Sequence, residues 1–476
     1  MANKFILNTT SLLFSMLLIW GCKTPQVTTI NENKSVPVSF NDSKDTTNSA
    51  STNWKTFFSD THLIHLIDTA LANNQELNIL LQEIAVDNNE ILARKGEYLP
   101  FVNLGAGAGL EKDGKYTRHG AVDESLNIRE GKAIPEPLPD FMFGAFASWE
   151  LDVWKKLRNG KKAAVTRYLS SIEGKNFMVT NLIAEISSSY YELMALDNLL
   201  EIVQKNIAIQ KNALHIIEQQ KQAAQETQLA VNRFAAQVLN TENLQYNIKQ
   251  QIVETENRIN FLVGRFPQPI ERSSSGFNEI TVNEIHSGIP SQLLKNRPDI
   301  KQAELTLAAA KLDVAIARAN FYPSFSIEAG VGFGSFNPKY LVNPQSILYN
   351  LGGELMAPLV NKNAIKATYN SANAKQLQAV YGYEQTILQA YIEVANQLSQ
   401  IANTSKSYET KAKEVDLLNQ SITISNSLFR SARADYMEVL LTQREALESR
   451  MELIEIKMSQ MNAKVNIYKA LGGGWN

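Results

Sequence analysis

The stretch Ala317 to Gly334, ARANFYPSFSIEAGVGFG, changes its periodicity at Pro323. The residues before the proline suit a helix, whereas apolar residues alternate with small or polar ones after it. Successive side chains of a strand point to opposite faces, so one face would carry Phe325, Ile327, Ala329, Val331 and Phe333. Proline ends helices and favours an extended residue before it. The stretch therefore predicts a helix that turns directly into a strand.

A second copy of this junction lies roughly 220 residues earlier, and such self-similarity indicates a duplicated unit. It reads ARKGEYLPFVNLGAGAGLE, from Ala93 to Glu111. Each copy is followed by another alternating segment, FMFGAFASWELDVW or SILYNLGGELMAPLV, and then by long helical stretches. The predicted organisation is a first repeat over 54–270, a connecting segment over 271–289 and a second repeat over 290–476. Each repeat would hold a helix, two strands and a long helix pair.

The helices are expected at Asp60–Tyr98, from Pro290 to the second junction, and over two long stretches without proline. The first long stretch starts near Asn159, and its apolar residues stand seven apart at Ile186, Leu193, Leu200, Ile207 and Leu214. Such heptads predict coiled-coil packing. A second apolar row with the same spacing, made of Leu182, Leu196, Val203 and Ile217, runs beside the first, and Ser189 and Gln210 interrupt it. About 65 residues per helix, at ~1.5 Å each, give rods of roughly 100 Å. The fold class is mainly α with a small β part.

Composition excludes several functions. The 476 residues carry a net charge of −2, which argues against a nucleic-acid partner. The single cysteine cannot form an intrachain disulfide, and five histidines offer few metal ligands. We predict no metal, no cofactor and no catalytic residue.

The N-terminus resembles a bacterial lipoprotein signal. Lys4 precedes the apolar run LLFSMLLIW, which is too short to cross a bilayer and ends at Gly21-Cys22. Residues 1–21 would be removed, and Cys22 would receive acyl chains such as palmitate, giving firm membrane anchoring. Residues 22–53 are polar and would form a tether. The alternative is an ordinary signal peptide with an incidental cysteine.

Four alternating strands are too few for one chain to close a membrane barrel. Each has about ten residues with one apolar face, which is typical of a transmembrane β-strand. Lipid tolerates no open sheet edge, and a barrel needs about eight strands or more. Two chains would supply eight strands and three would supply twelve. The inward face would line a pore with Asn103, Glu111, Glu150, Asp152, Glu328 and Glu354. Alternatively, some of these side chains only solvate the barrel rims.

Several segments together resemble TolC-like outer-membrane efflux channels of the NodT-type lipoprotein branch. They are NRPDIKQAELTLAAAKLDVAIARANFYPSFS, ASWELDVWKKLRNGKKAA, YEQTILQAYIEVANQLS and DYMEVLLTQREALE, with NIYKALGGGW at the end. The resemblance implies a homotrimer with one 12-stranded β-barrel in the outer membrane and one α-barrel in the periplasm. It also implies partnership with a periplasmic adaptor (membrane fusion) protein and an inner-membrane pump of the resistance-nodulation-division type. The chain would be a passive conduit that exports small toxic compounds and performs no chemistry.

The resemblance also implies a gate where the long helices turn, near Ala223–Leu229 and Ser431–Glu438. Arg433, Asp435 and Tyr436 match positions of gate and docking groups, and we expect them to hold the tip closed. Alternatively they cap helix ends, with Asp435 starting the last helix. The first turn, KQAAQETQLAV, lacks the glycine that the family usually has there.

Other readings are weaker. GLEKDGKY, Gly109 to Tyr116, nearly fits a phosphate-binding loop, but Tyr116 replaces the required Ser or Thr and no helix is expected to follow. His62 and His65 lack a third metal ligand nearby. A periplasmic coiled-coil scaffold or adaptor without a pore is the second candidate function, and a lipid-anchored enzyme is the third.

Overall fold

The computed structural model describes residues 25–28, 30–40, 46–129, 131–280, 286–431 and 433–475. These residues form two compact units. The sheet unit contains Ala85–Leu169 and Leu305–Tyr381, together with the described residues before Glu32. The bundle unit contains the described parts of Glu32–Ile84, Ser170–Glu304 and Gly382–Asn476. The predicted signal peptide, residues 1–21, and Cys22 lie outside the described residues.

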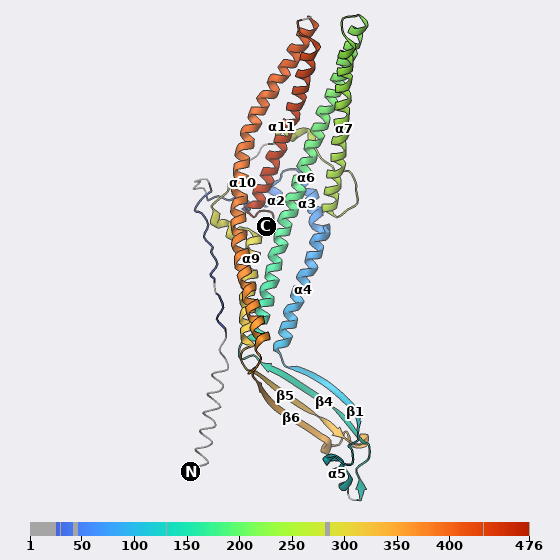
Figure 1. Cartoon of the computed structure of the whole chain (residues 1–476), viewed down its shortest axis with the longest axis vertical. Coiled ribbons are helices and arrows are strands. Elements are labelled where there is room, and N and C mark those ends of the chain that lie inside the picture. Colours follow the sequence, from blue (N-terminus) through green and yellow to red (C-terminus); the bar gives the residue numbers. More distant parts are fainter. Residues whose placement is uncertain are drawn as a thin grey trace. The chain divides into compact units, whose positions relative to one another are not determined.

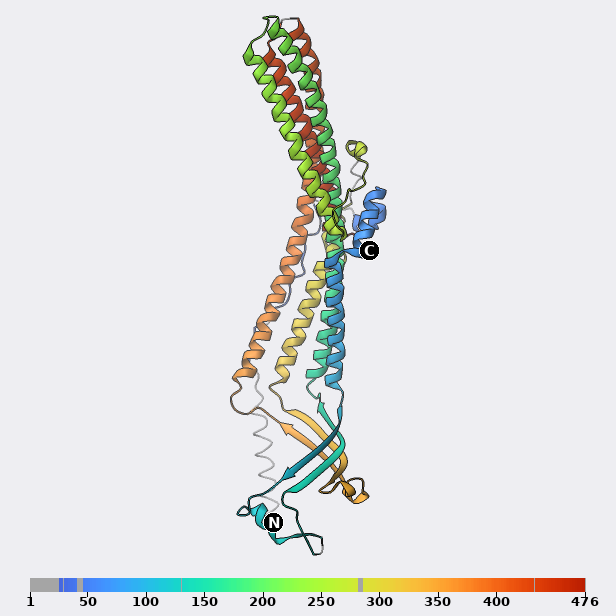
Figure 2. The same cartoon turned by 90° about the vertical axis from the view of Figure 1, so that its right-hand side faces the viewer.

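The sheet unit is built on one antiparallel sheet in the order β1-β4-β5-β6. Its strands are β1 (Phe101–Glu111), β4 (Leu138–Leu151), β5 (Ser324–Ser335) and β6 (Ile347–Met356). Figures 1 and 2 show the four strands side by side in a curved sheet. The strands β1 and β6 are its edges, so each leaves one side of its backbone without a partner strand in the described chain.

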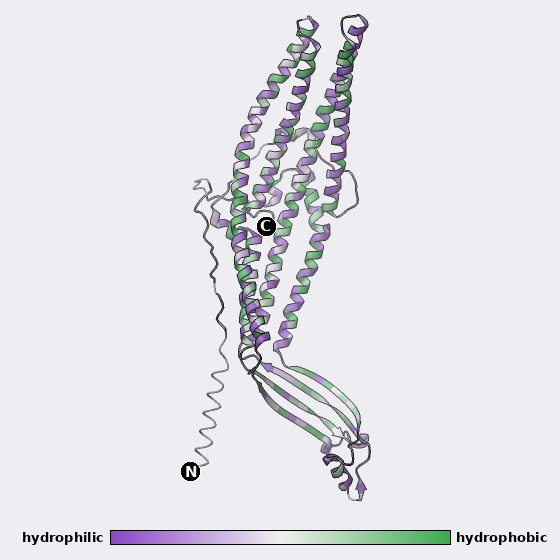
Figure 3. Cartoon of the chain, in the orientation of Figure 1, coloured by the Kyte–Doolittle hydropathy of each residue, from purple (hydrophilic) through white to green (hydrophobic). Residues whose placement is uncertain are grey.

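The strand register confirms the predicted alternation. Leu104, Ala145, Val331 and Tyr349 form one row across the sheet. The adjacent row is Asn103, Phe146, Gly330 and Asn350, which lies on the opposite face. One face therefore carries aliphatic and aromatic side chains, and the other carries most of the glycine and carboxylate positions. Figure 3 shows green and pale strands, whereas the loop around α5 is largely purple.

The connection between β1 and β4, over residues 112–137, contains further secondary structure. It includes the helix α5 (Arg118–Ser125) and a small hairpin of β2 (Asn127–Arg129) and β3 (Lys132–Ala133). Thr117 caps α5, because its hydroxyl accepts the N–H of Gly120. The connection between β5 and β6 holds two short 3₁₀ turns, η4 (Pro338–Tyr340) and η5 (Pro344–Ser346).

Most other described residues are helical. The two long pairs are α6 (Lys156–Gln222) with α7 (Gln228–Val263), and α10 (Asn363–Arg430) with α11 (Tyr436–Ala470). The corresponding members have nearly equal lengths, 67 and 68 residues for the first helices and 36 and 35 for the second. In the described part of the chain, no helix combines the length and apolar character needed to cross a bilayer.

Two predicted helices are interrupted. The helix expected over Asp60–Tyr98 divides into α3 (Thr61–Asn73) and α4 (Gln75–Tyr98). Asn74 lies between them in an extended conformation, and its side chain accepts the N–H of Leu77. The helix expected from Pro290 begins as η3 (Pro290–Gln292) and α8 (Leu293–Asn296), and α9 (Pro298–Ala319) follows after extended Arg297. The residue before a proline is disfavoured in a helix, which explains this second break.

The main core of the bundle unit joins α3, α6, α7 and α11 with α2 (Trp54–Phe57) and η2 (Ser274–Glu279). Its largest fully buried members include Tyr190, Leu63 and Phe277. Part of the predicted tether also packs on this unit. Phe40 is buried and stacks on Tyr391, with 5.2 Å between ring centroids. The polar composition concealed this contact, because one aromatic ring is enough to dock an extended segment.

Candidate functional site

Five of the six proposed pore-lining side chains belong to the face of the sheet that carries most of the glycines. The register places Asn103, Glu111, Glu150, Glu328 and Glu354 on this one face. Glu111 lies at the loop end of β1, whereas the other three glutamates lie at the end where the strands join helices. A period of two in the sequence is enough to bring them together on this face.

Two of these glutamates lie in one row. Glu150 and Glu354 are both opposite Ser326, and Glu328 lies two residues farther along β5 on the same face. Lys156 approaches the Glu150 carboxylate to 2.5 Å, so this acid has a basic partner. The arrangement can present negative charge to water on one side of the sheet while the other side remains apolar.

Asp152 has a different environment from the other five. It follows the last residue of β4, and its carboxylate accepts the backbone N–H groups of Leu157 and Arg158, both at 2.9 Å. The Arg158 guanidinium also donates to it at 3.0 Å. Asp152 thus pairs with two backbone N–H groups in the first turn of α6, which is the role of a helix cap. Its side chain is 2% exposed.

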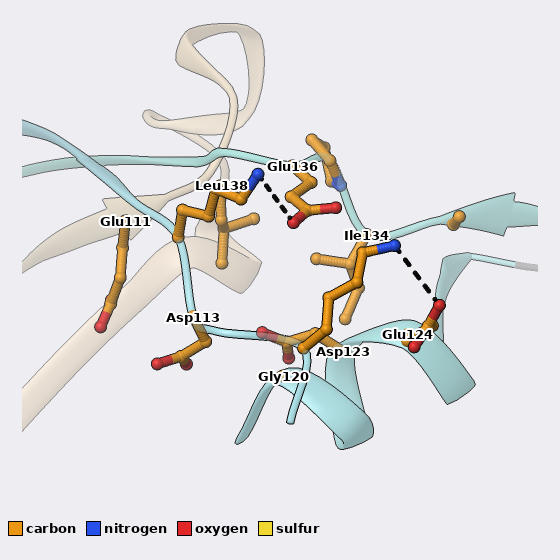
Figure 4. A pocket seen from close by; sticks show the side chains of 12 residues that line it. Glu111, Asp113, Gly120, Asp123, Glu124, Ile134, Glu136 and Leu138 are labelled. Carbon is orange, nitrogen blue, oxygen red and sulfur yellow. Dashed lines mark ion pairs between the residues drawn. The ribbon is translucent and has the colours of Figure 1, made fainter. Parts of the chain in front are cut away.

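The loop end of the sheet contains a hollow of about 190 Å³. Figure 4 shows carboxylates around it, and Lys112–Glu136 and Lys115–Glu124 form ion pairs at 3.1 and 3.6 Å. The near-match to a phosphate-binding loop runs along this hollow. Contrary to the expectation, the short helix α5 does follow it. The lining acids are Glu111, Asp113, Asp123, Glu124 and Glu136, and this charge disfavours a phosphate.

The three proposed gate residues lie at the turn between α10 and α11. Asp435 is the N-cap of α11 and accepts the N–H groups of Met437 and Glu438 at 2.8 and 3.1 Å. Tyr436 is half-buried against Phe234, with ring centroids 6.4 Å apart. The Arg433 side chain is exposed, while its backbone N–H donates to the Leu428 carbonyl at 2.9 Å. The three residues share a turn but have different immediate partners.

A small apolar cluster holds both helix turns together, and we name it the tip cluster. Its buried members are Ile217, Ala230 and Phe234, and Phe429, Tyr436 and Leu440 pack on them. Sequence periodicity did not single out this cluster, because its residues come from four different helices.

The first turn closes without glycine because an alanine takes the left-handed conformation. Ala224 has φ of 58°. The N–H of Ala224 donates to the Lys221 carbonyl, and the N–H of Gln225 donates to the Gln220 carbonyl. This is the hydrogen-bond pattern that ends many helices, where glycine usually supplies the left-handed residue. The turn therefore keeps the ordinary shape at a backbone cost of roughly 1 kcal/mol.

A polar layer, which we define as Gln210, Thr241 and Gln443, separates the tip cluster from the main core. Each of the three side chains is buried. On α6, Ile207 belongs to the main core and Leu214 packs on the tip cluster, with Gln210 between them. On α11, Leu447 and Leu440 flank Gln443 in the same way. Neither end of the Gln210 amide, nor Oε1 of Gln443, has a hydrogen-bond partner in the described chain.

Charged groups are also buried away from the tip. Arg297 donates to Asp299 and Glu393 at 2.7 Å and to the carbonyl of Ala470 at 2.9 Å. Burial alone would lower its pKa, but the two carboxylates outweigh this and raise the pKa above its usual value. Burial raises the pKa of Tyr468 to about 12. Arg297 lies in the NRPD segment that carried the resemblance, but its bonding to α10 and α11 could not be read from sequence.

The histidines that were considered as metal ligands line a shallow hollow of about 210 Å³ with Arg265 and Glu271. His62 Nδ1 lies 3.8 Å from the Glu271 carboxylate. In the residues that the structure describes, no cluster of three or more His, Cys, Asp or Glu side chains is arranged to hold a metal ion.

Comparisons with known proteins agree on one family. The family model described as "Outer membrane efflux protein" matches residues 66–265 and 289–473. The solvent efflux pump outer membrane protein SrpC of Pseudomonas putida is 26% identical over 423 residues, covering 89% of this chain and 87% of SrpC. The probable outer membrane lipoprotein SilC of Salmonella typhimurium is 25% identical over 425 residues, covering 89% and 88%.

Solved structures share the fold. The outer-membrane channel OprN superposes with a TM-score of 0.83 at 21% identity, covering 94% of this chain and 99% of OprN. The open state of the Neisseria gonorrhoeae MtrE outer membrane channel gives 0.81 at 20% identity, covering 96% and 99%. Since the family model spans most of the sequence, the chain belongs to the outer membrane efflux protein family.

Proposed function

We propose that three copies of this chain form the outer-membrane channel of a tripartite efflux system, a passive conduit for small toxic compounds. The observation that carries the proposal is a four-stranded sheet with one apolar face and two unpaired edges. Unpaired backbone groups are costly in lipid, so the sheet needs further strands from other chains. β1 and β6 run in opposite directions within the sheet, so β6 of one copy can pair antiparallel with β1 of the next.

The exposure of the edge strands supports this assembly. Leu104 is 88% exposed on β1, and Tyr349 is 82% exposed on β6. Both belong to the apolar face, which acyl chains would cover. A periplasmic scaffold, the second candidate, gives no reason for such a face.

The long helices carry a second set of unpaired seams. Exposed Leu239, Tyr246 and Val253 stand seven residues apart on α7, and exposed Leu417 and Ile424 do so on α10. Figure 1 shows α10 and α7 on the outer sides of the two long pairs. Coiled-coil spacing on two opposite edges predicts that α7 of one copy packs against α10 of its neighbour.

The tip cluster sets the register of this contact, because it places Phe429 near Ala230 and Phe234. At that level, Leu239 would face Ile424 of the next copy, and Tyr246 would face Leu417. We therefore expect a Leu239→Cys, Ile424→Cys variant to crosslink into a covalent trimer in isolated outer membranes. Asn240→Cys with Ile424→Cys is the matched control, since residue 240 points about 100° away on the helix. A crosslinked species limited to dimers, or none, would argue against the trimer.

Conduction separates the channel from the scaffold. Purified protein in planar bilayers should produce stepwise current increases, each from one inserted trimer. A scaffold would yield no current and would stay monomeric and soluble once the lipid anchor is removed. The expected partners, an adaptor protein and a resistance-nodulation-division pump, would dock at the helix turns and supply substrate and energy.

The gate remains part of this proposal. Surface ion pairs contribute only about 0–1 kcal/mol each, so a tip held by Arg433 and Asp435 could open readily. Because Asp435 also caps α11, two substitutions are needed to separate its roles. Asp435→Asn keeps a capping side chain but removes the charge, whereas Asp435→Ala removes both. A charge-based gate predicts larger current for both variants and for Arg433→Ala, and unchanged current in all three would discard it.

The repeat and the anchor complete the proposal. The paired helix lengths and the two strand pairs support a duplicated unit over 54–270 and 290–476 joined by 271–289. Cys22 would be acylated after removal of residues 1–21, with 22–53 leading to the body. Cys22→Ser should abolish the incorporation of radiolabelled palmitate, and a variant that still incorporates the label would exclude this site.

A further inference from the structure

Basic residues gather where β4 leads into α6. The segment KKLRNGKK, Lys155 to Lys162, directly follows Trp154. Between Glu150 and Arg167 there are six basic residues and two acidic ones, although the whole chain has a net charge of −2. This local excess of positive charge lies within the sheet unit, next to the end of a strand with an apolar face.

Neighbouring carboxylates neutralise only part of this charge. Glu150 pairs with Lys156 at 2.5 Å, and Asp152 pairs with Arg158 at 3.0 Å. Asp313 on α9 pairs with Arg167 at 2.5 Å. The remaining basic side chains, Lys155, Lys161 and Lys162, make no ion pair with any residue that the structure describes. Three positive charges within eight residues are therefore left for an outside partner.

The partner would meet side-chain ammonium groups rather than a helix end. Asp152 already accepts the N–H groups of Leu157 and Arg158, so the first turn of α6 is occupied. Lys155 and Lys162 are exposed, and Lys161 is partly so. Flexible ammonium groups act as point charges and suit a diffuse anionic surface.

An aromatic pair marks the same level of the chain. Trp154 stacks on Tyr322, with ring centroids 4.6 Å apart and an interplanar angle of 25°. The Trp154 indole N–H donates to the carbonyl of Pro323 at 2.7 Å. Trp and Tyr gather at membrane–water interfaces, where one part of the ring system is apolar and another is polar. The pair thus lies at the boundary between the apolar strand face and the charged segment.

We propose that Lys155, Lys161 and Lys162 bind the phosphate groups of anionic phospholipids in the leaflet next to the helices. The inference rests on the proposed function, because it requires the apolar face of the sheet to be in lipid. Each basic residue beside a membrane raises the affinity for anionic headgroups about fivefold. The attraction decays within a Debye length. The lysines would enrich such lipids around the channel and fix the depth of β4.

Spin-labelled lipids measure this enrichment. The full-length protein is reconstituted in phosphatidylcholine vesicles, and electron paramagnetic resonance gives the association of spin-labelled phosphatidylglycerol relative to spin-labelled phosphatidylcholine. Neutralising all three lysines (K155Q, K161Q and K162Q) should lower this ratio at least about fivefold. The matched control neutralises the exposed Lys249, Lys406 and Lys413 of the bundle unit and should leave the ratio unchanged. A K155R, K161R and K162R variant should retain the preference, and about 1 M NaCl should abolish it.

Other results would overturn the proposal. An unchanged ratio in the triple glutamine variant would do so, and so would a preference that inorganic phosphate removes at matched ionic strength. If the lysines line the water-filled lumen instead, the variant will shift the reversal potential in a salt gradient without changing the lipid ratio. Should the triple variant fail to insert, Lys162→Gln alone must still lower the ratio. Wild-type protein that retains phosphatidylglycerol but conducts no current would refute the channel and leave the lipid contact standing.

Discussion

Replacing Gln210 by leucine should stabilise the bundle unit. Gln210 is 1% exposed, and both ends of its amide lack a hydrogen-bond partner among the described residues. It lies in the coiled-coil seam of α6, between Ile207 of the main core and Leu214 of the tip cluster. Leucine has a similar volume and carries no polar atom, so the substitution removes the unsatisfied amide without leaving a large cavity.

The expected gain follows from the cost of burying an unpaired amide, which is about 1–3 kcal/mol. The bundle unit has about 280 residues, and unfolding entropy is about 2.1 cal/mol/K per residue. The melting temperature of this unit should therefore rise by about 2–5 °C. Gln443→Leu should act in the same direction, because its Oε1 is also unpartnered.

Differential scanning calorimetry of the detergent-solubilised protein at a fixed scan rate measures this shift. Gln204→Leu is the matched control, because Gln204 is exposed on the same helix, and surface substitutions usually change stability by less than about 0.5 kcal/mol. A Gln210→Leu protein that melts at or below the wild-type temperature would refute the reasoning. It would mean that the amide is hydrogen-bonded in solution and that the layer is a satisfied polar network.

Three further predictions concern backbone, pH and buried charge. Ala224→Gly should raise the stability of the bundle unit by about 1 kcal/mol, because glycine adopts the left-handed conformation freely; calorimetry would show a lower melting temperature if the turn were not left-handed. Burial raises the pKa of Tyr468 to about 12 from its ordinary value near 10, so its stabilising contribution is complete below pH 10 and is lost as the pH rises to 12. In the Tyr468→Phe variant the free energy of unfolding should depend less on pH between about 10 and 12. An unaltered dependence would assign the alkaline loss of stability to other groups. Arg297→Ala should cost about 3–5 kcal/mol in chemical denaturation, since it removes a buried guanidinium and leaves the Asp299 carboxylate, 15% exposed, without its partner. Arg258→Ala breaks an exposed pair with Glu192 and should cost at most about 1 kcal/mol.

The strands could be predicted because a period of two is a local signal. β1 begins directly after Pro100 and ends at Glu111, the last residue of the quoted junction stretch. β4 starts three residues before Phe141, the first residue of the quoted segment FMFGAFASWELDVW, because Leu138 still pairs with Glu111 in the register. The same periodicity brought five of the proposed pore residues onto one face. It misplaced Asp152, since β4 ends at Leu151 and a left-handed Lys155 turns the chain into α6.

Features that depend on contacts between distant segments could not be predicted in this way. The helix α5 and the β2–β3 hairpin occupy a polar stretch with no periodicity of its own. The break at Asn74 is stabilised partly by its side chain, whose amide donates to the Leu262 carbonyl at 2.8 Å, 188 residues away. Nothing near Asn74 in the sequence distinguishes it from the other asparagines of this helix. The docking of Phe40 on Tyr391 is likewise invisible without the fold.

The polar layer shows how one sequence irregularity acquires meaning from the fold. A glutamine in a heptad seam of one helix is ambiguous, because a single helix does not reveal what the seam faces. Thr241 and Gln443 are buried on two other helices, and each lies between residues that pack on the tip cluster and residues of the main core. Among the described residues, the layer therefore lies between two apolar clusters that pack separately. If the channel closes at its helix turns, as proposed, the layer would let the turns rearrange while the main core stays packed, because local opening follows units that pack as one.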